Sequence, residues 1–127
     1  MNELTDEWVA KAESDYDQAQ LAMYAVEIPL TDGVCFHSQQ CAEKYLKAFL
    51  QEKAIRFPRE HALVVLLELC LPFDPAFESL RSELRSLEQH AVAVRYPGVK
   101  VTDETAKSAL EATTHVRHFI RNKFQLK

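Results

Sequence analysis

Two arginine–histidine pairs have the residue types needed for acid–base chemistry on a phosphate. Arg85 and His90 are separated by four residues, and Arg56 and His61 show the same spacing. A histidine can transfer a proton and an arginine can stabilise the charge of a phosphorane, as metal-independent RNA cleavage requires. Chance alone gives about one such match in a chain of this composition. On a regular helix Arg85 and His90 would lie about 140° apart, so only a distortion or a second subunit would bring them together.

A second candidate is a group of polar and basic residues at helical spacing. Gln40, Lys44 and Lys47 fall on one side of a predicted helix, where they could hold a phosphate or a carboxylate. The alternative is a solvated surface on which Glu43 and Lys47 form an ion pair across one helical turn.

Further candidates lie at the ends of predicted helices. His61 precedes a short helix, where it could act on a ligand, although capping the helix is the preferred hypothesis. Arg95 and Tyr96 place a guanidinium and a phenol at the end of another helix. They could bind a ligand, or Arg95 could complement the helix dipole beside a packed Tyr96.

The cysteines and glycines argue against metals and cofactors. Cys35, Cys41 and Cys70 form no Cys-x-x-Cys pair, and Cys35 lies about 240° around the helix from Cys41. His37 and Cys41 lack a third ligand, so we predict no metal site. With two glycines the chain has no glycine-rich phosphate loop, and we expect no cofactor.

Length and composition set the class of protein. The 127 residues, 47% of them hydrophobic, predict one domain over residues 1–127. A net charge of −4 excludes electrostatic coating of nucleic acid, so any RNA contact must be local. The chain has no apolar run of about 20 residues, no leader before Trp8 and an odd number of cysteines. We therefore expect a soluble, cytoplasmic protein without membrane contact.

Apolar periodicity and turn residues predict an all-α, up-and-down bundle of about five helices with mostly antiparallel neighbours. The predicted helices cover residues 4–26, 31–54, 61–70, 75–94 and 102–124. Thr31 or Asp32 should cap the second helix, which should present Lys44 and Lys47 on a polar, basic face. The third is apolar nearly all round and should be buried.

Three blocks of sequence carry a resemblance to a known family. The blocks 35–48 (CFHSQQCAEKYLKA), 57–63 (FPREHAL) and 91–98 (AVAVRYPG) occur in the order seen in the HEPN family. The resemblance extends over nearly the whole chain.

The resemblance implies a four-helix core with a short extra helix, a homodimer, and association with nucleotide or RNA and a minimal nucleotidyltransferase. Some relatives are toxins that cut RNA at a dimer cleft with an Arg-x4-6-His motif, often with a tyrosine two residues after the histidine. Arg85 and His90 fit that motif, whereas position 92 is Val92.

The leading hypothesis is a dimeric module that binds nucleotide or RNA and acts with a nucleotidyltransferase in a toxin–antitoxin-like system. Two alternatives stay open: a metal-independent endoribonuclease that uses Arg85 and His90, and a purely structural oligomerisation bundle. The predicted binding residues are the polar side chains Lys44, Lys47, His61, Arg95 and Tyr96.

Overall fold

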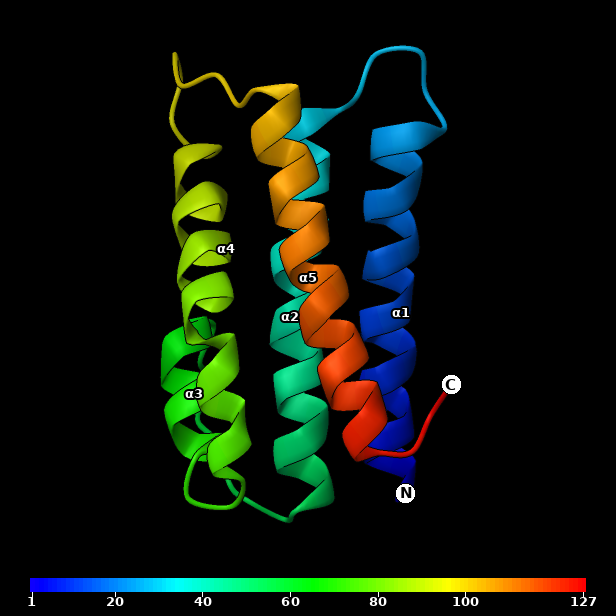
Figure 1. The fold of residues 1–127 in the computed structure, drawn as a ribbon, viewed down its shortest axis with the longest axis vertical. Coiled ribbons are helices and arrows are strands. Elements are labelled where there is room, and N and C mark those ends of the chain that lie inside the picture. The colour runs from blue at the N-terminus through cyan, green and yellow to red at the C-terminus, as the bar shows by residue number, and fades with distance from the viewer.

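A computed structural model describes residues 1–127 and confirms the all-α fold (Figure 1). The elements in chain order are α1 (Glu3–Tyr24), α2 (Thr31–Glu52), α3 (Leu63–Cys70), the 3-10 segment η1 (Pro75–Leu80), α4 (Arg81–Ala93) and α5 (Asp103–Lys123). No helix combines the length with the apolar composition that a membrane crossing requires.

Side-chain caps explain where several of these elements begin. The side chain of Asn2 accepts a hydrogen bond from the backbone N–H of Thr5 at 2.8 Å, and Thr102 accepts one from Thr105 at 3.1 Å. The prediction that Thr31 or Asp32 caps α2 is wrong. Leu30 occupies the cap position there, and no side chain satisfies that helix end.

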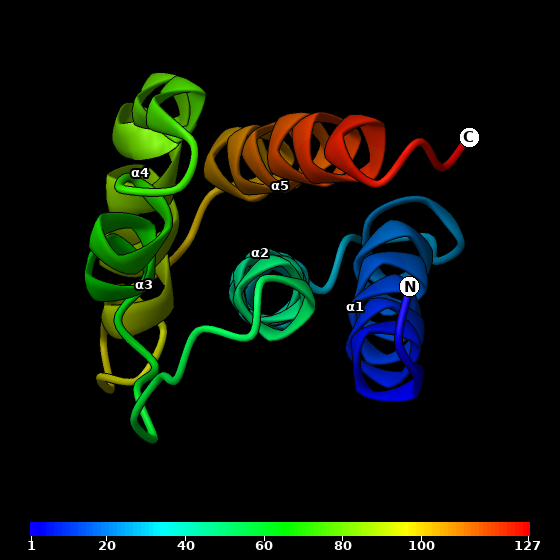
Figure 2. The ribbon, with the colours of Figure 1, turned by 90° about the horizontal axis from the view of Figure 1, so that it is seen from below.

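The α2 helix runs through the middle of the molecule. Seen end-on, it lies between α1, α5 and the pair formed by α3 and α4 (Figure 2). Thirteen of its residues are buried, because neighbours cover most of its circumference. The predicted exposed basic face on this helix is therefore wrong at Lys47, whose exposed fraction is only 6%. Lys44 is half-buried.

Three expectations about individual elements also need correction. The predicted fourth helix begins as 3-10 turns at Pro75 and becomes α-helical only at Arg81. The third is not buried all round, because Val65 is exposed on its outer side. On α1 the apolar stripe includes Leu4, which is exposed near the chain start.

The core consists of the inner faces of these helices. On α5 the predicted inner positions are buried from Ala106 to Ile120. Phe77 from η1 joins the two sides, since its ring lies 4.4 Å from that of Phe49 and 5.0 Å from that of Phe119 between centroids. The 3-10 segment thus closes one end of the bundle.

Candidate functional site

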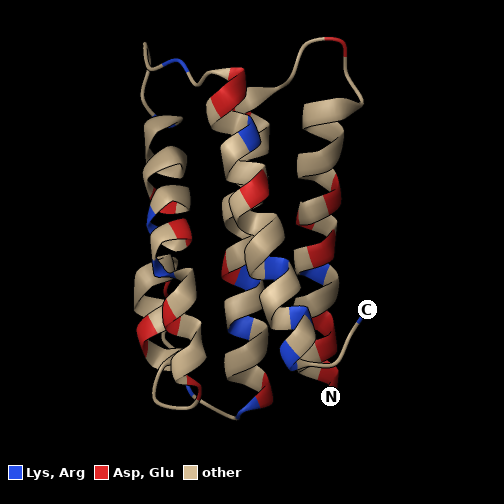
Figure 3. Cartoon of the chain, viewed as in Figure 1, with Lys and Arg blue, Asp and Glu red and all other residues tan.

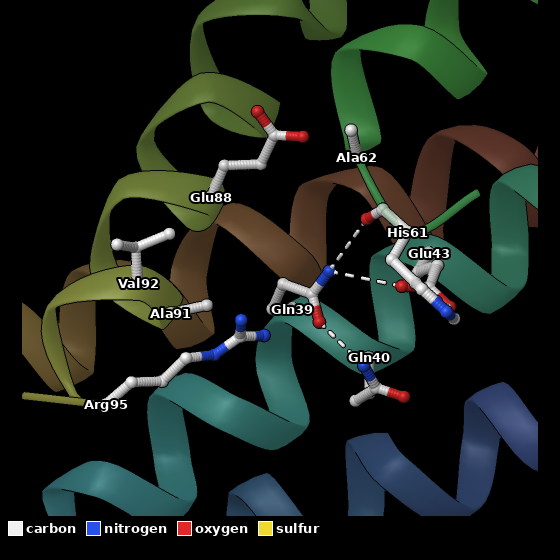
Figure 4. A pocket seen from close by; sticks show the side chains of 9 residues that line it. All are labelled: Gln39, Gln40, Glu43, His61, Ala62, Glu88, Ala91, Val92 and Arg95. Atoms are coloured by element: carbon white, nitrogen blue, oxygen red, sulfur yellow. Dashed lines mark hydrogen bonds and ion pairs between the residues drawn. The ribbon is translucent and has the colours of Figure 1, made fainter.

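A cavity of about 530 Å³ lies between α2, the segment before α3, and α4 (Figure 4). Its walls combine amides, charged groups and small apolar side chains. The lining residues are Gln39, Gln40, Glu43, His61, Ala62, Glu88, Ala91, Val92 and Arg95.

On the α2 side of the cavity, hydrogen bonds link the side-chain amides of Gln39 and Gln40. The Nε2 of Gln39 donates to the Oε1 of Glu43 at 3.3 Å and to the backbone carbonyl of His61 at 3.4 Å. The Oε1 of Gln39 accepts from the Nε2 of Gln40 at 2.8 Å. Gln39 is thereby held in one orientation, while the carbonyl of Gln40 has no partner within the protein.

Glu43 carries a buried carboxylate whose charge is compensated. Its Oε2 lies 3.1 Å from the Nζ of Lys47 and 3.2 Å from the Nδ1 of His61. Lys47 also faces the ring of Trp8, with 5.5 Å between Nζ and the ring centroid. Glu43 therefore has protein partners for both oxygens.

The wall formed by α4 and the turn after it contributes one engaged carboxylate, Glu88, and one free cation, Arg95. The Oε1 of Glu88 accepts from the backbone N–H of Val64 at 3.2 Å, in the first turn of α3. This contact replaces the cap that Ala62 cannot supply. Arg95 forms no ion pair, and its guanidinium extends over the cavity toward Gln39 (Figure 4).

The structure brings together two of the five predicted binding residues. His61 and Arg95 line opposite sides of the cavity. Lys47 lies behind Glu43, and Lys44 forms an ion pair with Asp15 on α1. Tyr96 does not line the cavity, and it is exposed rather than packed as the alternative interpretation of this segment expected.

His61 does not cap α3, contrary to the preferred hypothesis from sequence. The carboxylate of Glu60 accepts from the backbone N–H groups of His61 and Ala62, both at 2.9 Å. The imidazole itself is 77% exposed, with only its Nδ1 engaged. The other ring nitrogen is available to a ligand.

Arg85 and His90 both lie on α4 and outside the cavity. Arg85 is exposed, whereas His90 is half-buried and its Nδ1 has no hydrogen-bond partner. Because α4 is a regular helix over both positions, the two side chains leave it about 140° apart. A single chain therefore does not bring this pair together.

Sequence reasoning missed three residues of the cavity walls, Gln39, Glu43 and Glu88. Gln39 and Glu43 lie one helical turn apart, and Glu88 lies two turns before Arg95, which was predicted. These spacings can be read from the sequence. They do not indicate that the face of α2 with Gln39 and Glu43 lies opposite the face of α4 with Glu88.

Burial makes the three thiols poor nucleophiles. It raises the pKa of Cys35 to about 11 and the pKa values of Cys41 and Cys70 to about 12. All three are therefore neutral thiols near pH 7, which does not favour metal binding or covalent chemistry.

The comparison with known families agrees with this bundle and the order of its sequence blocks. Residues 5–123 match the HEPN domain. The chain belongs to the HEPN family, and the resemblance noted from its three sequence blocks is confirmed.

Two relatives align with nearly the whole chain. The crystal structure of ST0689, an archaeal HEPN homologue, is 25% identical with a TM-score of 0.71, covering 94% of this chain and 96% of that one. A protein of Methanocaldococcus jannaschii named "Putative toxin MJ1304" is 29% identical over 141 residues, covering 94% of this chain and 90% of the relative.

Proposed function

We propose that this protein is a toxin-type HEPN module that binds a nucleotide, or one nucleotide unit of RNA, in the cavity between α2 and α4. In this proposal it is a single-domain, cytoplasmic homodimer that acts with a nucleotidyltransferase. The toxin assignment rests on the relative from Methanocaldococcus jannaschii that carries that name.

The observation that carries the proposal is the uncommitted guanidinium of Arg95. Both carboxylates in the cavity already have protein partners: Lys47 and His61 compensate Glu43, and Val64 donates to Glu88. Arg95 is the one cation of the cavity without such a partner. A planar guanidinium on a cavity rim is well suited to hold a phosphate through two parallel hydrogen bonds.

The opposite wall suits a nucleobase. Both N–H groups of Gln39 are engaged, but its Oε1 can accept a second hydrogen bond, and Gln40 offers a free carbonyl and one unused N–H. These are donors and acceptors of the kind that read base edges. Ala91 and Val92 supply apolar surface for the face of a ring. A volume of about 530 Å³ falls in the range of small-molecule sites.

Fluorescence anisotropy with a labelled eight-nucleotide RNA, competed by unlabelled mononucleotides, tests the proposal. Arg95→Ala should weaken binding at least about tenfold, since a charge-assisted hydrogen bond contributes about 1.5–3 kcal/mol. It should also reduce the salt dependence by about 0.7 for each phosphate that the variant no longer neutralises. Lys107→Ala is the matched control, because it removes one exposed positive charge away from the cavity.

Each other outcome of this experiment has a definite meaning. Equally weakened binding in Arg95→Ala and Lys107→Ala would show that binding is non-specific. No binding at low salt would favour the structural bundle, and shortening of the RNA in EDTA that depends on Arg85 and His90 would favour the endoribonuclease.

Light scattering tests the homodimer separately. A mass that stays near 14.6 kDa at all concentrations would contradict it.

A further inference from the structure

An exposed apolar surface lies at the end of the bundle where α1 passes into α2. It comprises six of the large hydrophobic side chains that remain in contact with solvent, and Ile28 is the most exposed of them at 76%. We call this surface the α1–α2 patch, and its members are Leu21, Tyr24, Val26, Ile28, Leu30 and Phe36. Large exposed apolar side chains that cluster on one part of a surface mark interaction sites.

The patch is held in a fixed shape. The backbone N–H of Leu30 donates to the carbonyl of Ala22 at 2.9 Å, which fastens the connecting loop back onto α1. Leu21, Val26 and Leu30 then line a shallow groove of about 320 Å³ together with His37. A partner would therefore meet a surface that is already formed.

The chain segment that forms the patch carries exposed charge of one sign. No lysine or arginine occurs between residues 12 and 43. Asp17, Glu27 and Asp32 border the patch, are exposed and form no ion pair. The loop between α1 and α2 contains the acidic Glu27 and no basic residue, as Figure 3 shows. The three exposed charges that this segment places beside the patch are therefore negative and unpaired.

His37 adds an oriented acceptor at the edge of the groove. Its Nδ1 lies 2.7 Å from the Oδ1 of Asp15, so this nitrogen carries a proton. Lys44 binds the other oxygen of Asp15, which fixes the carboxylate between the two helices. In the neutral imidazole the Nε2 atom is then an acceptor, ready for an N–H group of a partner.

We propose that the α1–α2 patch docks a basic, amphipathic protein segment. Apolar side chains of the partner would fill the groove beside Leu21 and Leu30, and its lysines or arginines would face Asp17, Glu27 and Asp32. A second copy of this chain fits poorly, because a twofold contact would set acidic rim against acidic rim. An anionic lipid surface would be repelled by the same carboxylates.

A designed helical peptide of leucine and lysine, with leucines on one face, is the probe. The wild-type protein should bind this labelled peptide in an anisotropy titration, and salt should weaken the binding. The double variant Leu21→Ser/Ile28→Ser should bind at least about tenfold more weakly, as expected for central apolar contacts. The control Val65→Ser/Phe73→Ser, which removes exposed apolar groups elsewhere, should bind as the wild type does.

A second pair of reagents tests the charge argument. A peptide with glutamate in place of lysine should not bind. The triple variant Asp17→Asn/Glu27→Gln/Asp32→Asn should show little of the wild-type salt dependence. Thermal melting should show that all variants fold, because every substituted side chain is exposed.

Several outcomes would overturn the proposal. They are equal binding by the patch and control variants, tight binding of the glutamate peptide, and binding of phosphatidylglycerol vesicles in preference to the peptide. Loss of self-association in Leu21→Ser/Ile28→Ser would assign the patch to a second copy. Nucleotide binding in the cavity should be unchanged in these variants, so the two proposals fail independently.

Discussion

Replacing Lys47 by alanine should destabilise the fold strongly, because it breaks a buried ion pair. The side chains of Lys47 and Glu43 are 8% and 4% exposed, and their charged atoms lie 3.1 Å apart. In the variant the carboxylate of Glu43 stays buried with only Gln39 and His61 as partners. The attraction between the ammonium and the ring of Trp8 disappears as well.

The magnitude follows from these interactions. Removing one partner of a buried pair costs about 3–5 kcal/mol. The exposed His61 and the adjoining cavity give the carboxylate of Glu43 some access to water, which places the cost at the low end. We therefore expect Lys47→Ala to lower the free energy of unfolding by about 3 kcal/mol, a large share of the roughly 5–15 kcal/mol that stabilises a domain.

Urea denaturation followed by far-UV circular dichroism at pH 7 measures this effect. Fluorescence is less suitable, because Lys47 contacts the single tryptophan, Trp8. The double variant Glu43→Gln/Lys47→Met should recover most of the stability, since it leaves no uncompensated buried charge. Lys107→Ala should stay within about 0.5 kcal/mol of the wild type. A similarly small effect for Lys47→Ala would refute the buried pair and return Lys47 to the solvated surface.

Three further predictions concern the core, acid stability and thiol reactivity. Leu84→Ala should lower the free energy of unfolding, measured by urea denaturation, by about 2–5 kcal/mol, because it leaves a cavity in the core. Arg85→Ala should lower it far less, because Arg85 is exposed. Equal losses in the two variants would show that the inner face of α4 is misassigned. Although burial opposes ionisation, the hydrogen bond from Arg117 holds the pKa of Glu13 below its ordinary value of 4.5. The stability from Glu13 is therefore complete above pH 4.5 and is lost as pH falls through the lower folded value, so the wild type and Glu13→Gln should differ at pH 7 and converge in acid. Cys41 should react with a thiol reagent only after unfolding, and fast labelling of the native protein would contradict its burial.

The helices and most of their inward faces could be predicted from local patterns along the chain. Thr102 caps α5, and the buried stripe from Ala106 to Ile120 follows the helical period. Asp74 and Pro75 likewise mark the start of a helical segment, where Asp74 accepts from Ala76. These features are local, since caps and periodicity depend on residues within a few positions of each other.

The burial of the charged side chains and the presence of the cavity depend on how the helices pack against each other. The period places Lys47 on the same side as Lys44, but it cannot show that packing covers one and leaves the other half-buried. Arg95 and His61 are 34 positions apart, and they share a cavity only because α4 and the segment before α3 pack along the central α2. Burial and opposition of side chains depend on which helices become neighbours, and a helical period contains no information about the neighbour.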